Sequence, residues 1–167
     1  MGANERVERA LERALELAIG PSTPPRLADA MRYSVFPGGS RVRPGLVLAV
    51  ADACGGAVPP VADAAAAAVE LMHCASLVHD DLPCFDNASL RRGRASVHRA
   101  YGTELAVLVG DGLIVAAFEV LAAGCRRALP RLPSLVRAVS AGVGSAARTA
   151  CTGWPTPGTP ACSPTRW

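Results

Sequence analysis

The feature that most constrains this chain is a helix-type spacing of apolar residues that recurs along almost its whole length. In the first segment, Val7, Leu11 and Leu15 form one apolar stripe, while Glu5 and Arg9 lie four positions apart on the polar side. No stretch of useful length alternates apolar and polar residues as a half-buried strand does. The spacing therefore predicts an all-α fold, and 167 residues correspond to a single domain.

Proline and glycine residues divide the periodic segments from one another. Gly20-Pro21 ends the first helix, and Pro24-Pro25 opens the second. The helices after the first are predicted over residues 25–33, 44–53, 61–82, 104–125 and 132–147. Between them we expect a loop at 36–39 and a polar loop or short turn at 86–93.

Charge is divided unevenly along the chain. All 17 basic residues are arginine. Residues 1–119 carry a net charge of −3, whereas residues 120–167 contain no acid and carry +6. This distribution excludes a uniformly basic protein that binds nucleic acid. The most apolar stretch contains Asp111 and Glu119; because an acid at the bilayer centre costs about 3 kcal/mol, we expect a buried helix there and no membrane span.

The cysteines point to a reducing compartment. There are six, with neither a CxxC pair nor a regular spacing, which disfavours a zinc site. The amino-terminal segment alternates Glu and Arg and does not resemble a signal peptide. We therefore expect a cytoplasmic protein with reduced, buried thiols.

The last segment, residues 149–167, differs from the chain before it. It holds five of the seven Thr, four Pro and both Trp, with no acid, Leu, Ile or Val. It is interpreted either as a disordered tail or as sequence read out of frame after about Arg148, and the abrupt change in composition favours the second. The predicted domain therefore covers residues 1–148.

The densest group of reactive side chains follows the long apolar helix. Asp80, Asp81 and Asp86 are followed closely by Arg91 and Arg92. Adjacent carboxylates repel each other, and Mg²⁺ relieves this repulsion while accepting phosphate oxygens as further ligands. Arginine forks match phosphate oxygens. The pattern predicts a site for Mg²⁺ and a diphosphate; the alternative is a solvated helix end with local salt bridges.

Two further segments bear on this site. His73 and Ser76 precede the acidic cluster on one face of the predicted helix, although a single histidine is more often a core residue. Residues 38–44, GGSRVRP, place free backbone amides and two arginines at a helix start. Such a start suits an anion, and the alternative is a turn with solvated arginines.

These segments resemble the trans-polyprenyl diphosphate synthase family over residues from about 5 to 148. The matching segments are FPGGSRVRP at 36–44, similar to the family's GGKRxRP; ELMHCASLVHDDLP at 70–83, similar to its first aspartate-rich helix; Asp86 with LRRG at 90–93, which complete DDxxxxD…LRRG; and Gly110-Asp111, similar to the GD of the next core helix. The resemblance implies an isoprenoid-synthase-type helical bundle, of which this chain covers about the first half.

The resemblance also implies how the acidic cluster acts. Asp80, Asp81 and Asp86 would hold Mg²⁺ against an allylic diphosphate, and Arg91 would contact that diphosphate. The reaction implied is ionisation of the allylic diphosphate, attack by the double bond of isopentenyl diphosphate, and loss of a proton. The metal and the arginine would stabilise the leaving diphosphate, and apolar helices would shelter the carbocation from water.

Isopentenyl diphosphate would lie, by the same resemblance, against Arg43, His73 and Arg92. Ser40 belongs to this set by position, but the family usually has lysine there. One contact to the second substrate is therefore missing or supplied by another group.

The product is expected to be longer than C15. Ala75 and Ser76, about one helical turn before the acidic pair, are small and leave room for a growing chain. The resemblance suggests geranylgeranyl diphosphate for bacterial carotenoid and bacteriochlorophyll synthesis, with farnesyl diphosphate as the alternative.

The family's second aspartate-rich motif is missing from this sequence. We therefore expect the 167-residue chain to be inactive and to expose part of its apolar lining. A full-length form is expected to be a homodimer. The alternative is a non-catalytic partner subunit of a complete synthase.

Overall fold

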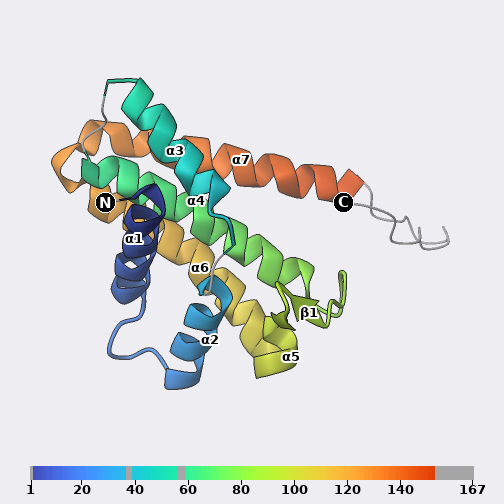
Figure 1. Ribbon diagram of the computed structural model, residues 1–167. Helices are drawn as coiled ribbons and strands as arrows, with labels where there is room; N and C mark the ends of the chain where they lie inside the picture. Colours follow the sequence, from blue (N-terminus) through green and yellow to red (C-terminus); the bar gives the residue numbers. More distant parts are fainter. Residues whose placement is uncertain (1, 37–38, 56–58, 153–167) are drawn as a thin grey trace.

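The computed structural model describes residues 2–36, 39–55 and 59–152, and most of these residues are helical (Figure 1). The α-helices are α1 (Ala3–Ala18), α2 (Pro25–Val35), α3 (Val42–Ala53), α4 (Pro59–Asp80), α5 (Val97–Tyr101), α6 (Thr103–Gly124) and α7 (Leu132–Thr152). A hairpin of β1 (Leu90–Arg91) and β2 (Arg94–Ala95) precedes α5, and the 3₁₀ turns η1 (Cys125–Arg127) and η2 (Leu129–Arg131) precede α7. The prediction of an all-α fold is confirmed.

The centre of the fold is the antiparallel pair of α4 and α6, which make the most extensive contact between elements. Gly124, at the end of α6, lies against Ala64 and Pro60 at the start of α4. At the other end of the pair, Gly110 lies against the ring of His79. Glycine permits this close approach because it has no Cβ. The two helices therefore fix each other's register at both ends.

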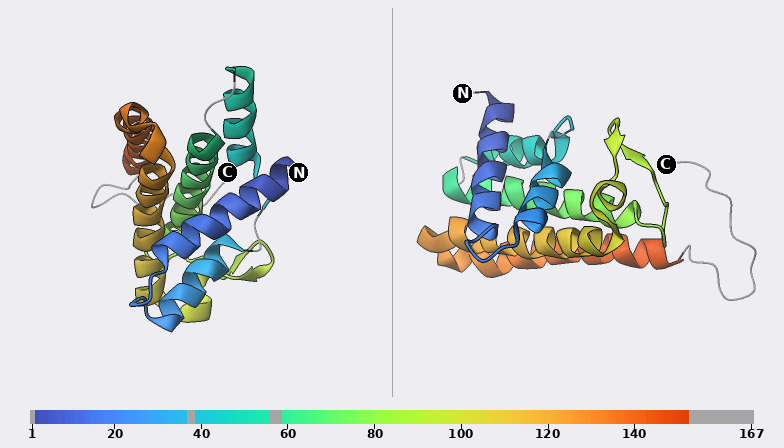
Figure 2. Two further views of the ribbon diagram at one scale, coloured as in Figure 1. Left: turned by 90° about the vertical axis from the view of Figure 1, so that its left-hand side faces the viewer. Right: turned by 90° about the horizontal axis from the view of Figure 1, so that it is seen from below.

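The remaining helices surround this pair. α1 contacts both α4 and α6, and α2 contacts mainly α6. Figure 2 shows that α1 and α2 cross the pair steeply, whereas α7 runs alongside it. Small side chains of α4 fill much of the core together with a few leucines: Ala64, Ala66, Ala67, Ala68, Ala75, Leu11, Leu15, Leu71, Leu113 and Leu121.

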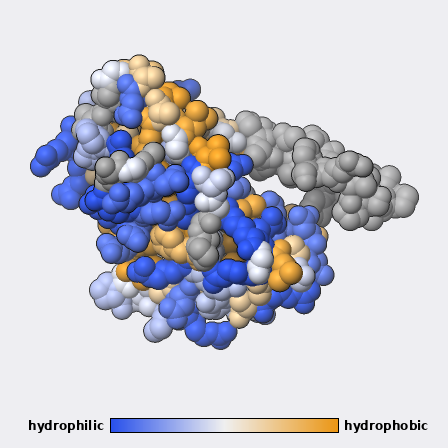
Figure 3. Space-filling model, in the orientation of Figure 1, coloured by the Kyte–Doolittle hydropathy of each residue, from blue (hydrophilic) through white to orange (hydrophobic). Residues whose placement is uncertain are grey.

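Apolar side chains are also exposed on several helices. On α3 these are Val42, Leu46 and Val50, each more than half exposed. Figure 3 shows apolar surface gathered in the region of α3. On α6, Leu108 and Val115 are likewise exposed. The described part of the chain thus presents apolar faces that no other described element covers.

Arg41, which directly precedes α3, bonds to residues of α1 and α4 and to the carbonyl oxygen of Val35 at the end of α2. Its backbone is left-handed, with φ at 50°, and its side chain is only 4 % exposed. The guanidinium donates to Glu8 of α1 at 2.7 Å and to Glu70 of α4 at 2.8 Å. Burial lowers the pKa of Arg41, but the two carboxylates outweigh this effect and raise it overall. A charge paired in this way is structural, so Arg41 adds little to an anion site.

The structure differs from the sequence prediction between the long helices. The segment predicted as a loop or turn at 86–93 contains β1, and β2 and α5 follow it. Arg92 and Gly93 form the tip of the hairpin with φ at 54° and 76°. Strands of two residues are too short to show an alternating pattern. The five-residue α5 is likewise too short to show a helical period.

The predicted end of the domain falls inside a helix. α7 continues through Thr152, beyond the boundary predicted at residue 148. The rest of the predicted tail, residues 153–167, lies outside the described residues.

Two helical stretches, residues 59–80 and 103–127, are long and apolar enough to cross a bilayer by length and composition. The first is mostly buried in the core, as the central helix of a globular fold is. The second exposes Asp111 and Glu119 along its middle. Length and composition therefore do not establish a membrane span.

Candidate functional site

Basic side chains from three elements meet at the end of α4. His73 lies half-buried on α4, Arg43 is exposed in the first turn of α3, and Arg92 is exposed at the tip of the hairpin. The pKa of His73 is lowered by burial first and then by the charges of Arg43, Arg92 and Arg91, with Glu70 acting in the opposite direction. The structure therefore brings together the residues predicted to hold isopentenyl diphosphate.

The two outer arginines of this group are available to an anion. Within the described ranges, neither Arg43 nor Arg92 forms an ion pair with an acid. Arginines without an ion-pair partner attract a ligand that carries several negative charges. The half-buried imidazole adds a polar group that a diphosphate oxygen can approach.

The segment that contains Gly39 lies against the tip of the hairpin. A Cβ built on Gly39 would stand 3.1 Å from the Cζ atom of Arg92. The glycine thus allows the guanidinium to rest on the backbone of the segment that leads into α3. Ser40 follows as an exposed residue. Pro37 and Gly38 of the same predicted segment lie outside the described residues.

Asp80 and Asp86 form the acidic side of the site. The chain turns back after α4, so that the backbone N–H of Asp86 donates to the carbonyl oxygen of Asp80 at 2.9 Å. The pKa of Asp80 is raised by burial first and by the charge of Asp86 second, and Arg91 opposes both effects. Two neighbouring exposed carboxylates, of which one raises the pKa of the other, are a suitable donor pair for a hard divalent cation.

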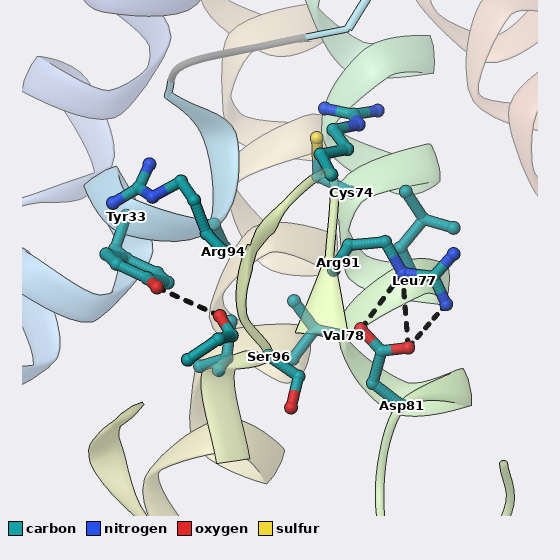
Figure 4. A pocket seen from close by; sticks show the side chains of 12 residues that line it. Tyr33, Cys74, Leu77, Val78, Asp81, Arg91, Arg94 and Ser96 are labelled. Carbon is teal, nitrogen blue, oxygen red and sulfur yellow. Dashed lines mark hydrogen bonds and ion pairs between the residues drawn. The ribbon is translucent and has the colours of Figure 1, made fainter. Parts of the chain in front are cut away.

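Asp81 points away from solvent and is bound by Arg91. Its side chain is 3 % exposed, and the Arg91 guanidinium donates to it through Nε, at 3.1 and 3.2 Å, and through Nη2 (Figure 4). The hydrogen bond to Asp81 is the main reason why the pKa of Arg91 is raised. The Nη1 group of Arg91 donates no hydrogen bond to any described residue. Asp81 therefore orients Arg91, and its predicted role as a metal ligand stays a prediction.

Among the described residues, no three His, Cys, Asp or Glu side chains are grouped closely enough to hold a metal ion. Asp80 and Asp86 nevertheless fit Mg²⁺, which takes one or two carboxylates and completes its shell with water and phosphate oxygens. The donor set suits a cation that arrives with a diphosphate. It does not suit a structural metal held by protein groups alone.

The wall predicted from helical spacing is present. His73, Ser76 and Asp80 are at least partly exposed, whereas Cys74, Ala75 and Val78 between them are buried. The Ser76 hydroxyl donates to the carbonyl oxygen of His73 at 2.9 Å. These residues therefore line one face of α4 that leads toward the acidic pair.

Sequence reasoning missed the residues that hold the hairpin. Tyr33 of α2 and Arg94 of β2 contact each other and join α2 to the hairpin (Figure 4). Tyrosine and arginine at these positions carry no spacing signal that links them. Their contact exists only because the fold returns the hairpin to the end of α2.

A model of the polyprenyl synthetase family matches residues 24–147. The chain belongs to this family. The match includes every residue of the basic and acidic groups described above. The predicted resemblance is confirmed.

Relatives in the polyprenyl synthetase family agree with the match. A geranylgeranyl diphosphate synthase of Cereibacter sphaeroides is 51 % identical over 144 residues, which are 86 % of this chain and 50 % of that protein. A geranylgeranyl diphosphate synthase of Rhodobacter capsulatus is 57 % identical over 122 residues, 73 % of this chain and 42 % of that protein. This chain therefore spans about half the length of these curated relatives.

The fold of this family member agrees with a solved structure. A crystal structure of an isoprenoid synthase family member from Thermotoga neapolitana superposes with a TM-score of 0.68 at 41 % identity. The superposition covers 81 % of this chain and 51 % of that one. The predicted isoprenoid-synthase-type bundle, present in part, is therefore confirmed.

Proposed function

We propose that this chain is the substrate-binding first half of a prenyltransferase that condenses isopentenyl diphosphate with an allylic diphosphate in the presence of Mg²⁺. The observation that carries the proposal is that Arg43, Arg92 and Arg91 lie near enough to His73 to lower its pKa, while Arg91 also lies near Asp80 and Asp86. A basic group linked in this way to paired carboxylates suits two diphosphates, one bound directly and one bound through a cation.

Each side of the site has a distinct task. Arg43, His73 and Arg92 bind the diphosphate of isopentenyl diphosphate and orient its double bond. Arg91, oriented by Asp81, directs its free N–H groups toward the allylic diphosphate. Asp80 and Asp86 would hold Mg²⁺, which would supply positive charge to stabilise diphosphate as a leaving group.

The product is proposed to be geranylgeranyl diphosphate. Ala75 is fully buried and Ser76 is exposed on the wall of α4, so neither closes the path away from the acidic pair. The two bacterial relatives that carry this name support the same choice over farnesyl diphosphate. A role in carotenoid synthesis, a cytoplasmic location and a homodimeric full-length form belong to the same proposal.

The test is calorimetric binding of inorganic diphosphate to the 167-residue chain, with and without Mg²⁺. We expect binding without metal that Arg92→Met weakens about tenfold, since a charge-assisted contact is lost. We expect Mg²⁺ to tighten binding in the wild type and not in Asp80→Asn. Equal affinities for the wild type and Arg92→Met would refute the proposed site.

A second experiment concerns the chain itself. Sequencing the gene across the codons for Ala146 to Trp167, and translating all three frames, shows whether another frame continues with apolar helices and a second aspartate-rich motif. Such a frame would make this chain part of a full prenyltransferase. Its absence would favour the partner-subunit alternative.

A further inference from the structure

The hairpin that carries Arg91 and Arg92 is too small to hold its own orientation. Each strand has two residues, and a short isolated hairpin is marginally stable in water. Arg92 is also a non-glycine residue with φ at 54°, in the left-handed region that costs free energy. Contacts from outside the hairpin must therefore keep this backbone in place.

Tyr33 and Arg94 supply these contacts. The Tyr33 hydroxyl donates to the carbonyl oxygen of Ala95 at 2.9 Å. The guanidinium of Arg94 lies 3.9 Å from the centroid of the Tyr33 ring, and its Nη1 donates to the carbonyl oxygen of Phe36 at 2.8 Å. In Figure 4 the Tyr33 ring and the Arg94 side chain lie together on one side of the hairpin, and Arg91 and Asp81 lie on the other.

This clamp, defined as Tyr33 with Arg94, connects both basic segments of the site. Phe36 caps α2 and stands three positions before Gly39. Gly39 in turn touches the guanidinium of Arg92. Arg94 lies in the hairpin that carries Arg92, and it also bonds to Phe36, which shortly precedes Gly39. A shift at the clamp changes the distance between Arg92 and the α3 and α4 residues of the site.

We propose that Tyr33 and Arg94 are positioning residues that hold Arg92 against His73 and Arg43 for diphosphate binding. The inference rests on the proposed function, because it assumes that these three residues receive a diphosphate. In this proposal Arg94 acts through Arg92, since its own cation lies on the tyrosine ring and its Nη1 donates to Phe36. Tyr33 acts through both of its contacts, the ring face and the hydroxyl.

The test is a double-mutant cycle on the full 167-residue chain, with inorganic diphosphate as the probe in calorimetry. Tyr33→Leu and Arg94→Met are each expected to weaken binding about tenfold. The double variant is expected to be only about as weak as either single one, because both act through one clamp. A product of the two effects, about a hundredfold loss, would mean that Arg94 binds the ligand directly and would overturn the proposal.

Conservative and control variants separate positioning from charge. Arg94→Lys keeps the charge but loses the planar fork that stacks on the ring and donates to Phe36, so it is expected to weaken binding nearly as much as Arg94→Met; wild-type affinity would mean that the charge of Arg94 and not the clamp matters. Tyr33→Phe keeps the ring and loses only the hydroxyl contact, so an intermediate loss is expected. Arg126→Met removes the same charge at the far end of α6, where Arg126 is exposed, and is expected to change affinity less than about twofold.

Amide hydrogen exchange of residues 89–96 tests the clamp without any ligand. We expect Arg94→Met to speed this exchange about tenfold relative to Arg126→Met, because the hairpin loses its outside support. If exchange increases and the wild type binds no diphosphate, the clamp stands and the proposed function fails. Unchanged exchange in Arg94→Met refutes the clamp whatever the chain binds.

Discussion

The folded chain disfavours the ionised form of the Asp80 carboxylate. Burial and Asp86 raise its pKa, so the ionised form opposes folding. The stability linked to a raised pKa is present below the unfolded pKa of about 3.9 and is lost as the pH rises through the folded pKa. At pH 7 without metal, Asp80→Asn should therefore raise the free energy of unfolding slightly, on the order of 0.5 kcal/mol at this exposed site.

The same substitution tests metal binding by a melting experiment. Mg²⁺ should raise the melting temperature of the wild type and leave that of Asp80→Asn unchanged, because a ligand stabilises only the form that binds it. Asp52→Asn, an exposed acid on α3, serves as the control and should respond to Mg²⁺ like the wild type. An equal response of all three proteins would argue against Asp80 as a ligand.

His73 should couple diphosphate binding to proton uptake. Burial and three arginines lower its pKa below 6.5, so it is neutral at pH 7 in the free chain. The stability linked to a lowered pKa is present above the unfolded value and is lost as the pH falls through the folded value. A bound diphosphate favours the imidazolium and shifts this pKa upward. Affinity should therefore rise as the pH falls below about 6.5.

Calorimetry in buffers of different ionisation enthalpy measures the protons taken up on binding. His73→Asn should bind diphosphate with fewer protons taken up than the wild type at pH 6, and the remainder belongs to the ligand itself. Identical proton uptake by the two proteins would show that His73 does not face the anion.

At the level of residues, local spacing predicted the wall of α4 and the acidic pair, whereas the grouping of His73 with Arg43 and Arg92 came from the family resemblance. His73, Asp80 and Asp86 lie on or just after one helix, and helical geometry alone places them together. The roles of Arg41 and Asp81 were different. Arg41 pairs with acids of α1 and α4, and Asp81 with an arginine ten positions away across a turn. Such pairings depend on tertiary structure, which no spacing rule contains.

At the level of elements, the contact between α4 and α6 depends on residues without side chains. A Cβ on residue 124 would clash with Ala64 and lie 2.8 Å from the backbone oxygen of Pro60. Backbone cannot move aside as a flexible side chain does. Gly124→Ala should therefore lower the free energy of unfolding by about 1–3 kcal/mol, as overpacking does. Chemical denaturation with detection by circular dichroism measures it.

Gly142→Ala is the matched control in α7. Nothing lies within 4 Å of the position of its Cβ. Alanine at an open helical position should stabilise the chain by up to about 1 kcal/mol. Opposite signs for the two substitutions are expected, and a loss at both positions would mean that the effect at 124 is not specific to the crossing of α4 and α6.

Long helices were predictable and short elements were not. The helices α4 and α6 show many turns of apolar spacing, so their existence followed from the sequence, with α4 ending at Asp80 and not near Leu82. The two-residue strands and α5 carry too few residues for any period. The hairpin forms because Tyr33 and Asp81 bind it from other elements and because Arg94 of β2 donates to Phe36.

At the level of the whole molecule, the exposed apolar faces on α3 and α6 predict how this chain behaves in solution. Val42, Leu46 and Leu108 are among the apolar side chains that no described element covers. We expect the 167-residue chain to self-associate at micromolar concentration, since such faces associate in water. Analytical ultracentrifugation measures it, and Leu46→Lys should reduce the association. A monomer at all concentrations would contradict this expectation.

The same chain should transfer no prenyl group. It spans about half the length of its curated relatives, and among the described residues no three His, Cys, Asp or Glu side chains lie close enough to hold a metal ion. An assay with radiolabelled isopentenyl diphosphate, an allylic diphosphate and Mg²⁺ should give no product above background. Product formation that depends on Asp80 would show that the first half is sufficient for catalysis.

The order of the site along the chain has a consequence for protein synthesis. Gly39, Arg43, His73 and Arg92 all come before the end of α6 at residue 124. A ribosome that has released this much chain has released the site and the helices that pack directly around it. We expect Arg43, His73 and Arg92 to come together on the nascent chain before the following residues emerge. A diphosphate that binds them would stabilise the growing polypeptide during translation.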